Sequence, residues 1–397
     1  MLLMSWILGI CSGYKIGAYL GDISAAFDRV FKYYLLAKLH RAGVGSTYLN
    51  FLEAYLAPRQ GKVVVQGTAS ELFTLEDQVF QGTVLGPPLW NSFFADVALP
   101  ASATGGQEAI FADDLNVFKL FARLESVDVV ENDLADCRSR VHTWGRMNRV
   151  SFDPSKEHLV VIHPSEYHGE AFKMLGLMID LDLRMHSAID QLLSKIRPKS
   201  TAILRTRAYY SIAELINQYK THVWCLVEMH CGGYFHAATS LLEKVDQVQR
   251  NFLSKLEVSE EKAFLDFSFA PTVLRRTIGI LGFLHKRVLG KCHRSFDTLL
   301  PWYNDHFDTP RSFGHNKQLY GHWLEATQHR SLYDRSIFAM IDIYNNLPQN
   351  VVDALSVSSF QSLLTNKVKE RCRQHVPLWE YSFCRRTGPD LSGPIIV

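Results

Sequence analysis

The sequence predicts an α+β fold in which a split βαβ unit, with an antiparallel sheet and covering helices, is followed by helices to the C-terminus. Two observations predict it. In the first half, segments of alternating apolar residues are interrupted by segments with helical spacing, in the order strand, helix, hairpin, helix and strand. From about residue 184 the apolar residues keep the helical period, with expected breaks at Pro198, Gly232-Gly233, Pro271 and around Pro301.

Local signals define the elements of the first half. Residues 2–11 are apolar but lack a basic leader and a cleavage site, which favours a buried helix over a signal peptide. Glycine closes the first helical segment, and Ser46 is a suitable cap for the second. The expected elements are a strand over 16–23, helices over 28–42 and 46–57, a hairpin around Gly67-Thr68, a helix over about 86–98, a turn over 101–106, strands on both sides of Asp113-Asp114, a helix over 125–148, and strands over 159–162 and 172–177.

Composition places the chain among folded globular proteins, with 47% hydrophobic and 21% charged residues in 397. No apolar run approaches the length of a membrane span, so no membrane partner is expected. Seven scattered cysteines without a CxxC pair indicate a reducing, intracellular compartment and do not distinguish nucleus from cytoplasm. His222, Cys225, His230, Cys231 and His236 fit no common zinc spacing and favour a structural core.

Charge is distributed unevenly, although the net charge is only +2. Residues 1–183 carry 15 Lys and Arg against 21 Asp and Glu, residues 184–296 carry 17 against 9, and residues 297–397 carry 10 of each. An acidic first region suits metal ions, and a basic second region suits a phosphate backbone, although a chance variation of surface charge gives the same pattern. We therefore expect three regions with these boundaries.

Two acidic segments and one glycine-punctuated loop carry the chemistry. Asp22-Ile23-Ser24-Ala25-Ala26-Phe27-Asp28 follows the first strand, and Phe111-Ala112-Asp113-Asp114 lies at a tight turn. Adjacent carboxylates repel each other and require a nearby cation, and oxygen ligands are those that Mg²⁺ prefers. The split βαβ plan brings Asp22 and the Asp113-Asp114 turn onto adjacent strands. With the loop Gln81–Pro87 between them, this order predicts a polymerase palm, although either acidic motif alone is more often a simple turn.

In these motifs the chain resembles the reverse transcriptases of non-LTR (LINE-type) retrotransposons. DISAAFD at residues 22–28 resembles palm motif A, QGTVLGP at 81–87 motif B, FADD at 111–114 motif C, WGRMNRVSFDPSK at 144–156 motif D, and LGLMID at 175–180 the primer grip of motif E. Looser similarities continue at 274–286 and 344–348. The resemblance implies a palm over 1–183, a helical thumb-like region over 184–296, and a helical C-terminal region of unknown role over 297–397.

The resemblance implies RNA-directed DNA polymerisation with two Mg²⁺ or Mn²⁺ ions. Asp22 and Asp113 would bridge the ions, Asp114 would assist, and the carbonyl of Ile23 could add a ligand. Lys156 would donate a proton to the pyrophosphate leaving group, with a solvated lysine as the plainer alternative.

The same resemblance assigns the substrate contacts. Phe27 would exclude a 2′-hydroxyl, unless it merely packs in the core. Gln81 would contact the incoming deoxynucleoside triphosphate, and Gly82 would let the backbone approach it closely.

Basic residues after 184 are expected to follow the backbone of an RNA template and a DNA primer without reading sequence. The four residues of this expected cluster, for which a solvated helix face is the alternative, are Arg275, Arg276, Lys286 and Arg287. The oligomeric state is not predicted.

One departure from the family bears on activity. Motif A begins at residue 22, where the family places a long fingers region, and often an endonuclease, before it. We therefore expect a palm and thumb fragment, and an inactive remnant that only binds nucleic acid is the alternative. An RNA-dependent RNA polymerase is disfavoured by Phe27, and a two-metal phosphodiesterase by the lack of histidine in these motifs.

Overall fold

The computed structural model describes residues 1–24, 26–75, 78–103, 105–305 and 315–384. They divide into two compact units. The sheet unit comprises Lys15–Ile162 and Glu166–Gly169, and the helical unit comprises Met1–Tyr14, His163–Ser165 and the described part of Glu170–Val397. The first helix and residues 170–183, which the sequence groups with the palm, thus belong to the helical unit. The three regions 1–183, 184–296 and 297–397 stay a prediction.

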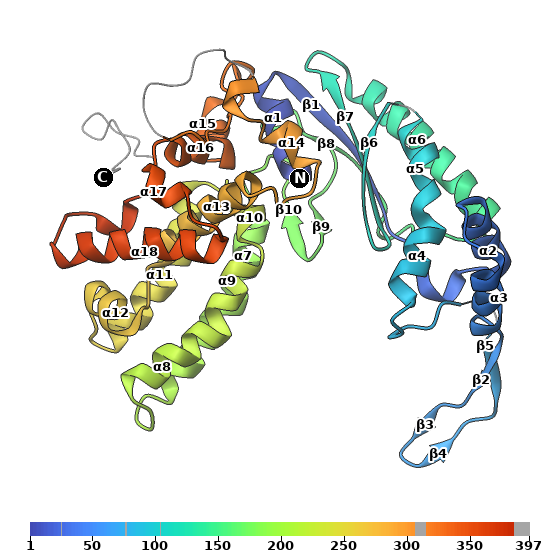
Figure 1. Ribbon diagram of the computed structural model, residues 1–397, viewed down its shortest axis with the longest axis horizontal. Coiled ribbons are helices and arrows are strands. Elements are labelled where there is room, and N and C mark those ends of the chain that lie inside the picture. The colour runs from blue at the N-terminus through green and yellow to red at the C-terminus, as the bar shows by residue number, and fades with distance from the viewer. Residues whose placement is uncertain (25, 76–77, 104, 306–314, 385–397) are drawn as a thin grey trace. The chain divides into compact units, whose positions relative to one another are not determined.

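A four-stranded sheet forms the centre of the sheet unit, in the order β6-β7-β1-β8 (Figure 1). Its strands are β6 (Gln107–Phe111), β7 (Asp114–Ala122), β1 (Tyr14–Gly21) and β8 (His158–Ile162). The β6–β7 and β1–β8 pairs are antiparallel. The predicted split arrangement is confirmed at the decisive point, because β7 is the hydrogen-bonded neighbour of β1.

Helices of the sheet unit follow the predicted order. They are α2 (Lys32–Arg41), α3 (Ser46–Tyr55), α4 (Gly86–Phe94), α5 (Ala98–Ser102) and α6 (Val127–Asn148), with 3₁₀ turns η1 (Ala26–Arg29) and η2 (Ala95–Val97). The helix expected from residue 28 begins only at Lys32, because η1 occupies the preceding residues. The turn expected from 101 begins later, since α5 continues to Ser102.

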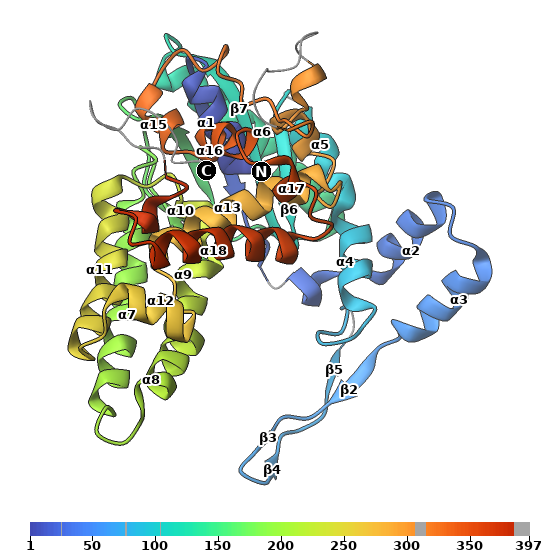
Figure 2. The ribbon, with the colours of Figure 1, turned by 60° about the vertical axis from the view of Figure 1, so that its left-hand side comes forward.

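The predicted hairpin is confirmed and extends away from α4 (Figure 2). Its base pairs β2 (Arg59–Gly61) with β5 (Phe73–Leu75), and its tip pairs β3 (Val64–Val65) with β4 (Thr68–Ala69). The turn residues Gln66 and Gly67 both have positive φ, at 50° and 83°. Two consecutive residues of this kind match the right-handed twist of a tight hairpin.

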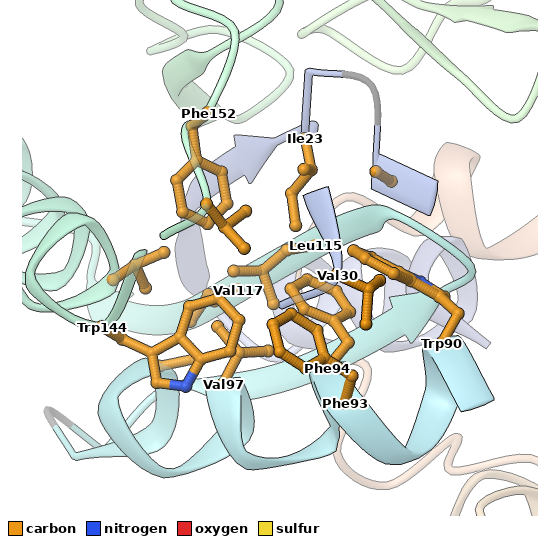
Figure 3. Packing of buried hydrophobic residues seen from close by; sticks show 14 of the residues in the cluster. Ile23, Val30, Trp90, Phe93, Phe94, Val97, Leu115, Val117, Trp144 and Phe152 are labelled. Carbon is orange, nitrogen blue, oxygen red and sulfur yellow. The ribbon is translucent and has the colours of Figure 1, made fainter. Parts of the chain in front are cut away.

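The core of the sheet unit lies between the sheet and its helices (Figure 3). Leu115 and Val117 from β7 meet Phe93 and Phe94 from α4, and Trp144 from α6 packs edge-on against Phe94 at 5.6 Å between ring centroids. Burying a large apolar side chain contributes about 1.5–3 kcal/mol. This packing fixes the strand that begins with Asp114.

The helical unit contains the predicted N-terminal buried helix, a two-stranded hairpin and a series of helices. Its elements are α1 (Leu2–Cys11), β9 (Phe172–Met174), β10 (Leu177–Ile179), α7 (His186–Arg205), α8 (Ile212–Tyr219), the π-helical η3 (Lys220–Trp224), α9 (Cys225–Met229), α10 (Cys231–Tyr234), α11 (Thr239–Lys255), α12 (Glu260–Phe267), α13 (Thr272–Val288), α14 (Phe296–Leu299), η4 (Tyr303–Asp305), α15 (Arg330–Asp334), α16 (Ile337–Asn345), α17 (Gln349–Val352), α18 (Val357–Arg373) and η5 (Trp379–Tyr381).

Two sequence predictions in this unit are wrong. The strand expected over 172–177 is a hairpin, because Leu175 and Gly176 take positive φ and turn the chain. The break expected at Pro198 does not occur, and α7 runs through it. Proline in a helix costs about 3 kcal/mol. Buried apolar residues on both sides of it, such as Ile196 and Ile203, pack α7 against the unit and outweigh that cost.

Candidate functional site

Three carboxylates gather where β1 ends and β7 begins. Asp22 directly follows β1, Asp114 is the first residue of β7, and Asp113 lies in the turn between β6 and β7. Ala112 takes a positive φ of 54° in that turn. Burial raises the pKa of the Asp114 carboxyl, and the negative charges of Asp22 and Asp113 raise it further. Asp114 therefore lies close enough to Asp22 and Asp113 to be repelled by their charges.

Lys156 brings a positive charge to this cluster. Its Nζ donates a hydrogen bond of 2.6 Å to Oδ2 of Asp22, which is 14% exposed. This hydrogen bond and the charge of Asp22 raise the pKa of Lys156, so the ammonium form is favoured. The charge of Lys156 in turn opposes the rise in the pKa of Asp114. One lysine thus offsets part of the repulsion among three carboxylates.

The backbone around Lys156 is tied to the segment after β1. The Asp153 amide donates to the Asp22 carbonyl at 3.0 Å, and the Ser24 amide donates to the Ser151 carbonyl at 3.2 Å. These bonds flank an antiparallel bridge between Ile23 and Phe152. In such a pair the peptide groups of Ile23 itself point away from residues 151–153. The carbonyl of Ile23 is thus left free of this bridge.

The sequence analysis did not identify Glu157, whose hydrogen bonds hold the segment next to Lys156 in place. The carboxylate of Glu157 accepts hydrogen bonds of 2.7 Å from the Tyr19 hydroxyl and from Nε2 of His142. Burial and the hydrogen bond to Glu157 raise the pKa of Tyr19. These contacts hold the start of β8, and with it Lys156, against β1 and α6. No local pattern marks them, because the partners lie 138 and 15 residues away in the chain.

Gln81 and Gly82 form an exposed turn before α4. Gly82 has a φ of +79°, and a Cβ built on it would meet no other atom within 4 Å. The Thr83 hydroxyl donates to the Phe80 carbonyl at 2.7 Å and closes the turn. A side chain at position 82 would thus be opposed by backbone conformation and not by crowding. The turn is open to an approaching ligand.

Trp90 of α4 contacts the first and third motifs, and the sequence analysis did not single it out. Its Nε1 donates to the Ala112 carbonyl at 2.9 Å, within the turn that carries Asp113. Its ring stacks on that of Phe27, with 5.8 Å between centroids and 29° between planes. Phe27 is half-buried, and its carbonyl accepts a hydrogen bond from the Val79 amide at 2.8 Å. One face of the Phe27 ring is therefore supported by Trp90, and part of the side chain remains exposed to solvent.

The chemistry of the donor set suits a hard divalent cation. Three carboxylates and the backbone carbonyl of Ile23 offer only oxygen, and the pKa of Asp114 is raised by burial and then by the negative charges of its neighbours. Within the described residues, no three His, Cys, Asp or Glu side chains already stand in a metal-binding arrangement, and this includes the histidines and cysteines between 222 and 236. At Asp22, the ammonium of Lys156 supplies the positive charge.

The expected basic cluster in the helical unit is not one exposed face. Arg276 is 5% exposed and forms a two-bond ion pair with Asp246, and Arg287 is 7% exposed and pairs with Asp297 at 3.3 Å. The prediction that these two arginines are exposed to a phosphate backbone is wrong, because both side chains are buried and form ion pairs with carboxylates.

Arg275 and Lys286 differ from them in exposure. Arg275 is partly exposed, pairs with Glu228, and lies 3.8 Å over the ring of Trp224. Lys286 is exposed. The role of these two residues in nucleic-acid binding stays a prediction. No helix in the described ranges is both long and apolar enough to cross a lipid bilayer.

Comparison with known proteins gives relatives of one kind. The chain is 27% identical over 272 residues to the RNA-directed DNA polymerase from mobile element jockey of Drosophila funebris, which covers 64% of this chain and 28% of the relative. The corresponding jockey protein of Drosophila melanogaster is 26% identical over 264 residues, covering 61% and 28%. A probable RNA-directed DNA polymerase from transposon X-element of Drosophila melanogaster is 25% identical over 247 residues, covering 57% and 27%.

The chain thus spans little more than a quarter of the length of the curated relatives it matches. No protein-family model matches it. Among solved structures, telomerase from Candida albicans aligns over 72% of this chain and 48% of its own at 9% identity, with a TM-score of 0.29 that is too low to establish a common fold. The resemblance to reverse transcriptases of non-LTR retrotransposons, predicted from the motifs, is confirmed by the jockey and X-element polymerases.

Proposed function

We propose that the sheet unit is the palm of an RNA-directed DNA polymerase, which extends a DNA primer on an RNA template with deoxynucleoside triphosphates. One observation carries the proposal. Asp22, Asp113 and Asp114, from motifs about ninety residues apart, interact electrostatically at one end of two adjacent strands. The glycine turn at Gln81, and Trp90 of the following helix, which contacts Phe27 and the Asp113 turn, support the same assignment.

The carboxylates of Asp22, Asp113 and Asp114 and the carbonyl of Ile23 would hold two Mg²⁺ or Mn²⁺ ions. When bound, such ions activate an attacking hydroxyl and stabilise a leaving phosphate oxygen. Lys156 is protonated on Nζ, with a pKa raised by Asp22, and would pass this proton to pyrophosphate as the leaving group. Phe27, braced by Trp90, would place its open edge beneath the sugar and exclude a 2′-hydroxyl.

The turn at Gln81 and Gly82 would position the incoming nucleotide. Its exposure and the open space at Gly82 allow backbone to approach a triphosphate closely. Positioning of this kind supplies several kcal/mol of the barrier reduction in transfer reactions, roughly 7–11 kcal/mol in the best-oriented cases. The helical region 184–296 would serve as the thumb, with Arg275 and Lys286 as its available cations.

The second candidate is a protein that binds nucleic acid without catalysis. The ion pair between Lys156 and Asp22 favours it, since this pair engages a carboxylate that polymerisation needs for a metal ion. The two candidates share their nucleic-acid contacts and differ only in turnover.

Primer extension separates the two candidates. A labelled DNA primer on an RNA template is incubated with the chain, deoxynucleotides and Mg²⁺ or Mn²⁺, and Asp113→Asn serves as the blank. Polymerase function predicts extension that falls by at least about a thousandfold in Asp113→Asn, a loss of about 4 kcal/mol.

Asp28→Asn is the matched control, because Asp28 is an exposed carboxylate in the same motif that has no proposed ligand role. It should extend primers like the unsubstituted chain. If the chain binds primer–template but does not extend the primer with either metal, its function is nucleic-acid binding without catalysis.

A further inference from the structure

Four aromatic rings form a continuous row on the outer side of α3. Tyr48, Phe51 and Tyr55 follow at helical spacing, with ring centroids 5.8 Å and 6.2 Å apart. Phe80, from the end of the hairpin, continues the row at 6.5 Å from Tyr55. The row therefore ends beside Gln81, within the same compact unit.

This row lies beside the buried face of α3. Leu52, which neighbours Tyr48 and Tyr55 on the helix surface, is 1% exposed, whereas Tyr48 and Phe51 are 51% and 52% exposed. Exposed rings that gather in one patch mark a binding surface more often than rings scattered singly. Tyr55 packs partly against the core, whereas Tyr48 and Phe51 leave about half of their surface exposed and available to a ligand.

A cation accompanies the rings. The guanidinium of Arg59 lies 3.8 Å from the ring centroid of Phe80 and 5.6 Å from that of Tyr55. Among the described residues Arg59 pairs with no carboxylate, and its hydrogen bond goes to the Tyr55 carbonyl at 3.4 Å. An arginine held against aromatic rings keeps donors that can reach a phosphate.

The charge of the surrounding segment favours an anionic ligand. Residues 29–75 contain six Lys and Arg against two Glu, whereas the rest of residues 1–183 contains nine against nineteen. One of the six, Lys38, is occupied by Asp96 at 2.8 Å. The aromatic row thus lies in a basic segment of a region that is acidic as a whole. A polyanion matches that charge better than an apolar protein surface does.

We propose that this row binds single-stranded nucleic acid, with bases stacked on Tyr48 and Phe51 and a backbone phosphate at Arg59. Unpaired bases are required because only they expose a face for stacking. Every base has such a face, so the contact reads no sequence. The inference rests on the proposed function only for the path of the strand, which would run along the row toward the Gln81 turn.

Fluorescence anisotropy with labelled 12-nucleotide oligo(U) and oligo(dT) tests the proposal without requiring polymerisation. Tyr48→Ala and Phe51→Ala should each weaken binding about tenfold, within the range known for stacking contacts. Arg59→Gln should reduce the slope of log affinity against log salt by about one. The matched control is Tyr33→Ala, which removes an equally exposed ring of α2 that lies outside the row.

The variants are compared by circular dichroism melts to establish that they are folded. Unchanged affinity in the Tyr48→Ala/Phe51→Ala double variant, or an equal loss in Tyr33→Ala, would overturn the proposal. So would tighter binding of a blunt duplex than of the single strands. Light scattering provides a further outcome, because a dimer that the double variant abolishes would make the row a protein interface.

Asp113→Asn keeps the two proposals apart. It should lose primer extension and retain oligonucleotide binding, whereas the ring variants should lose binding. Failure of extension in the unsubstituted chain would therefore contradict the polymerase and leave the binding result to be judged by itself.

Discussion

Arg276→Met should destabilise the helical unit strongly, because it breaks a buried ion pair on one side only. The Arg276 and Asp246 side chains are each 5% exposed, and their two hydrogen bonds join α13 to α11. Methionine would fill much of the space but leave the Asp246 carboxylate buried without a partner. Breaking such a pair typically costs about 3–5 kcal/mol. The loss is a large fraction of the roughly 5–15 kcal/mol that stabilises a folded domain.

Thermal and urea unfolding, followed by circular dichroism, measure the effect. A unit of this size loses about 2–4 °C of Tm for each kcal/mol, so Tm should fall by about 10 °C. Lys286→Met is the matched control on the same helix, and as an exposed substitution it should stay within about 0.5 kcal/mol. Adding Asp246→Leu to Arg276→Met should restore much of the stability, since an apolar pair can replace a buried ionic one.

The reasoning would be refuted if Arg276→Met melted like Lys286→Met and instead lost affinity for primer–template duplex. Arg276 would then serve phosphate binding, as its sequence context alone suggested. Retained affinity in a destabilised protein would confirm the structural role.

Three further outcomes are expected. Phe27→Val should raise ribonucleotide incorporation by more than about tenfold, measured as the ratio of ribonucleotide to deoxynucleotide kcat/KM, and an unchanged ratio would reduce Phe27 to core packing. Lys156→Met should slow single-turnover nucleotide addition about 10²–10⁴-fold while primer–template affinity is kept, and an unchanged rate would contradict its role as proton donor. Gly17→Ala should destabilise the sheet unit by about 1–3 kcal/mol in urea unfolding, because the new Cβ would lie 2.6 Å from Phe121 and 2.7 Å from Val130, and a neutral result would mean that these side chains can move aside.

Local sequence predicted most elements of the sheet unit and the position of its carboxylates. Alternating apolar residues, turn glycines and helical spacing are short-range signals, and here the tertiary structure agrees with them at β1, the β6–β7 turn and α6. The neighbouring positions of Asp22 and Asp114 followed from strand order alone, because a split βαβ unit places those two strand ends together.

Tertiary structure decided the partners of the charged and polar side chains. The Lys156–Asp22 pair joins residues 134 positions apart, and nothing near either residue announces the other. Arg276 and Lys286 lie on one helix and look alike in sequence, yet one is buried against Asp246 and the other is exposed. The backbone at Pro198 also depends on tertiary structure, because packing of buried residues on both sides of it outweighs the preference of proline to end a helix. Burial and ion pairing depend on residues distant in the chain, whereas turns and periodicity depend on neighbours, and this difference separates what the sequence determined from what folding decided.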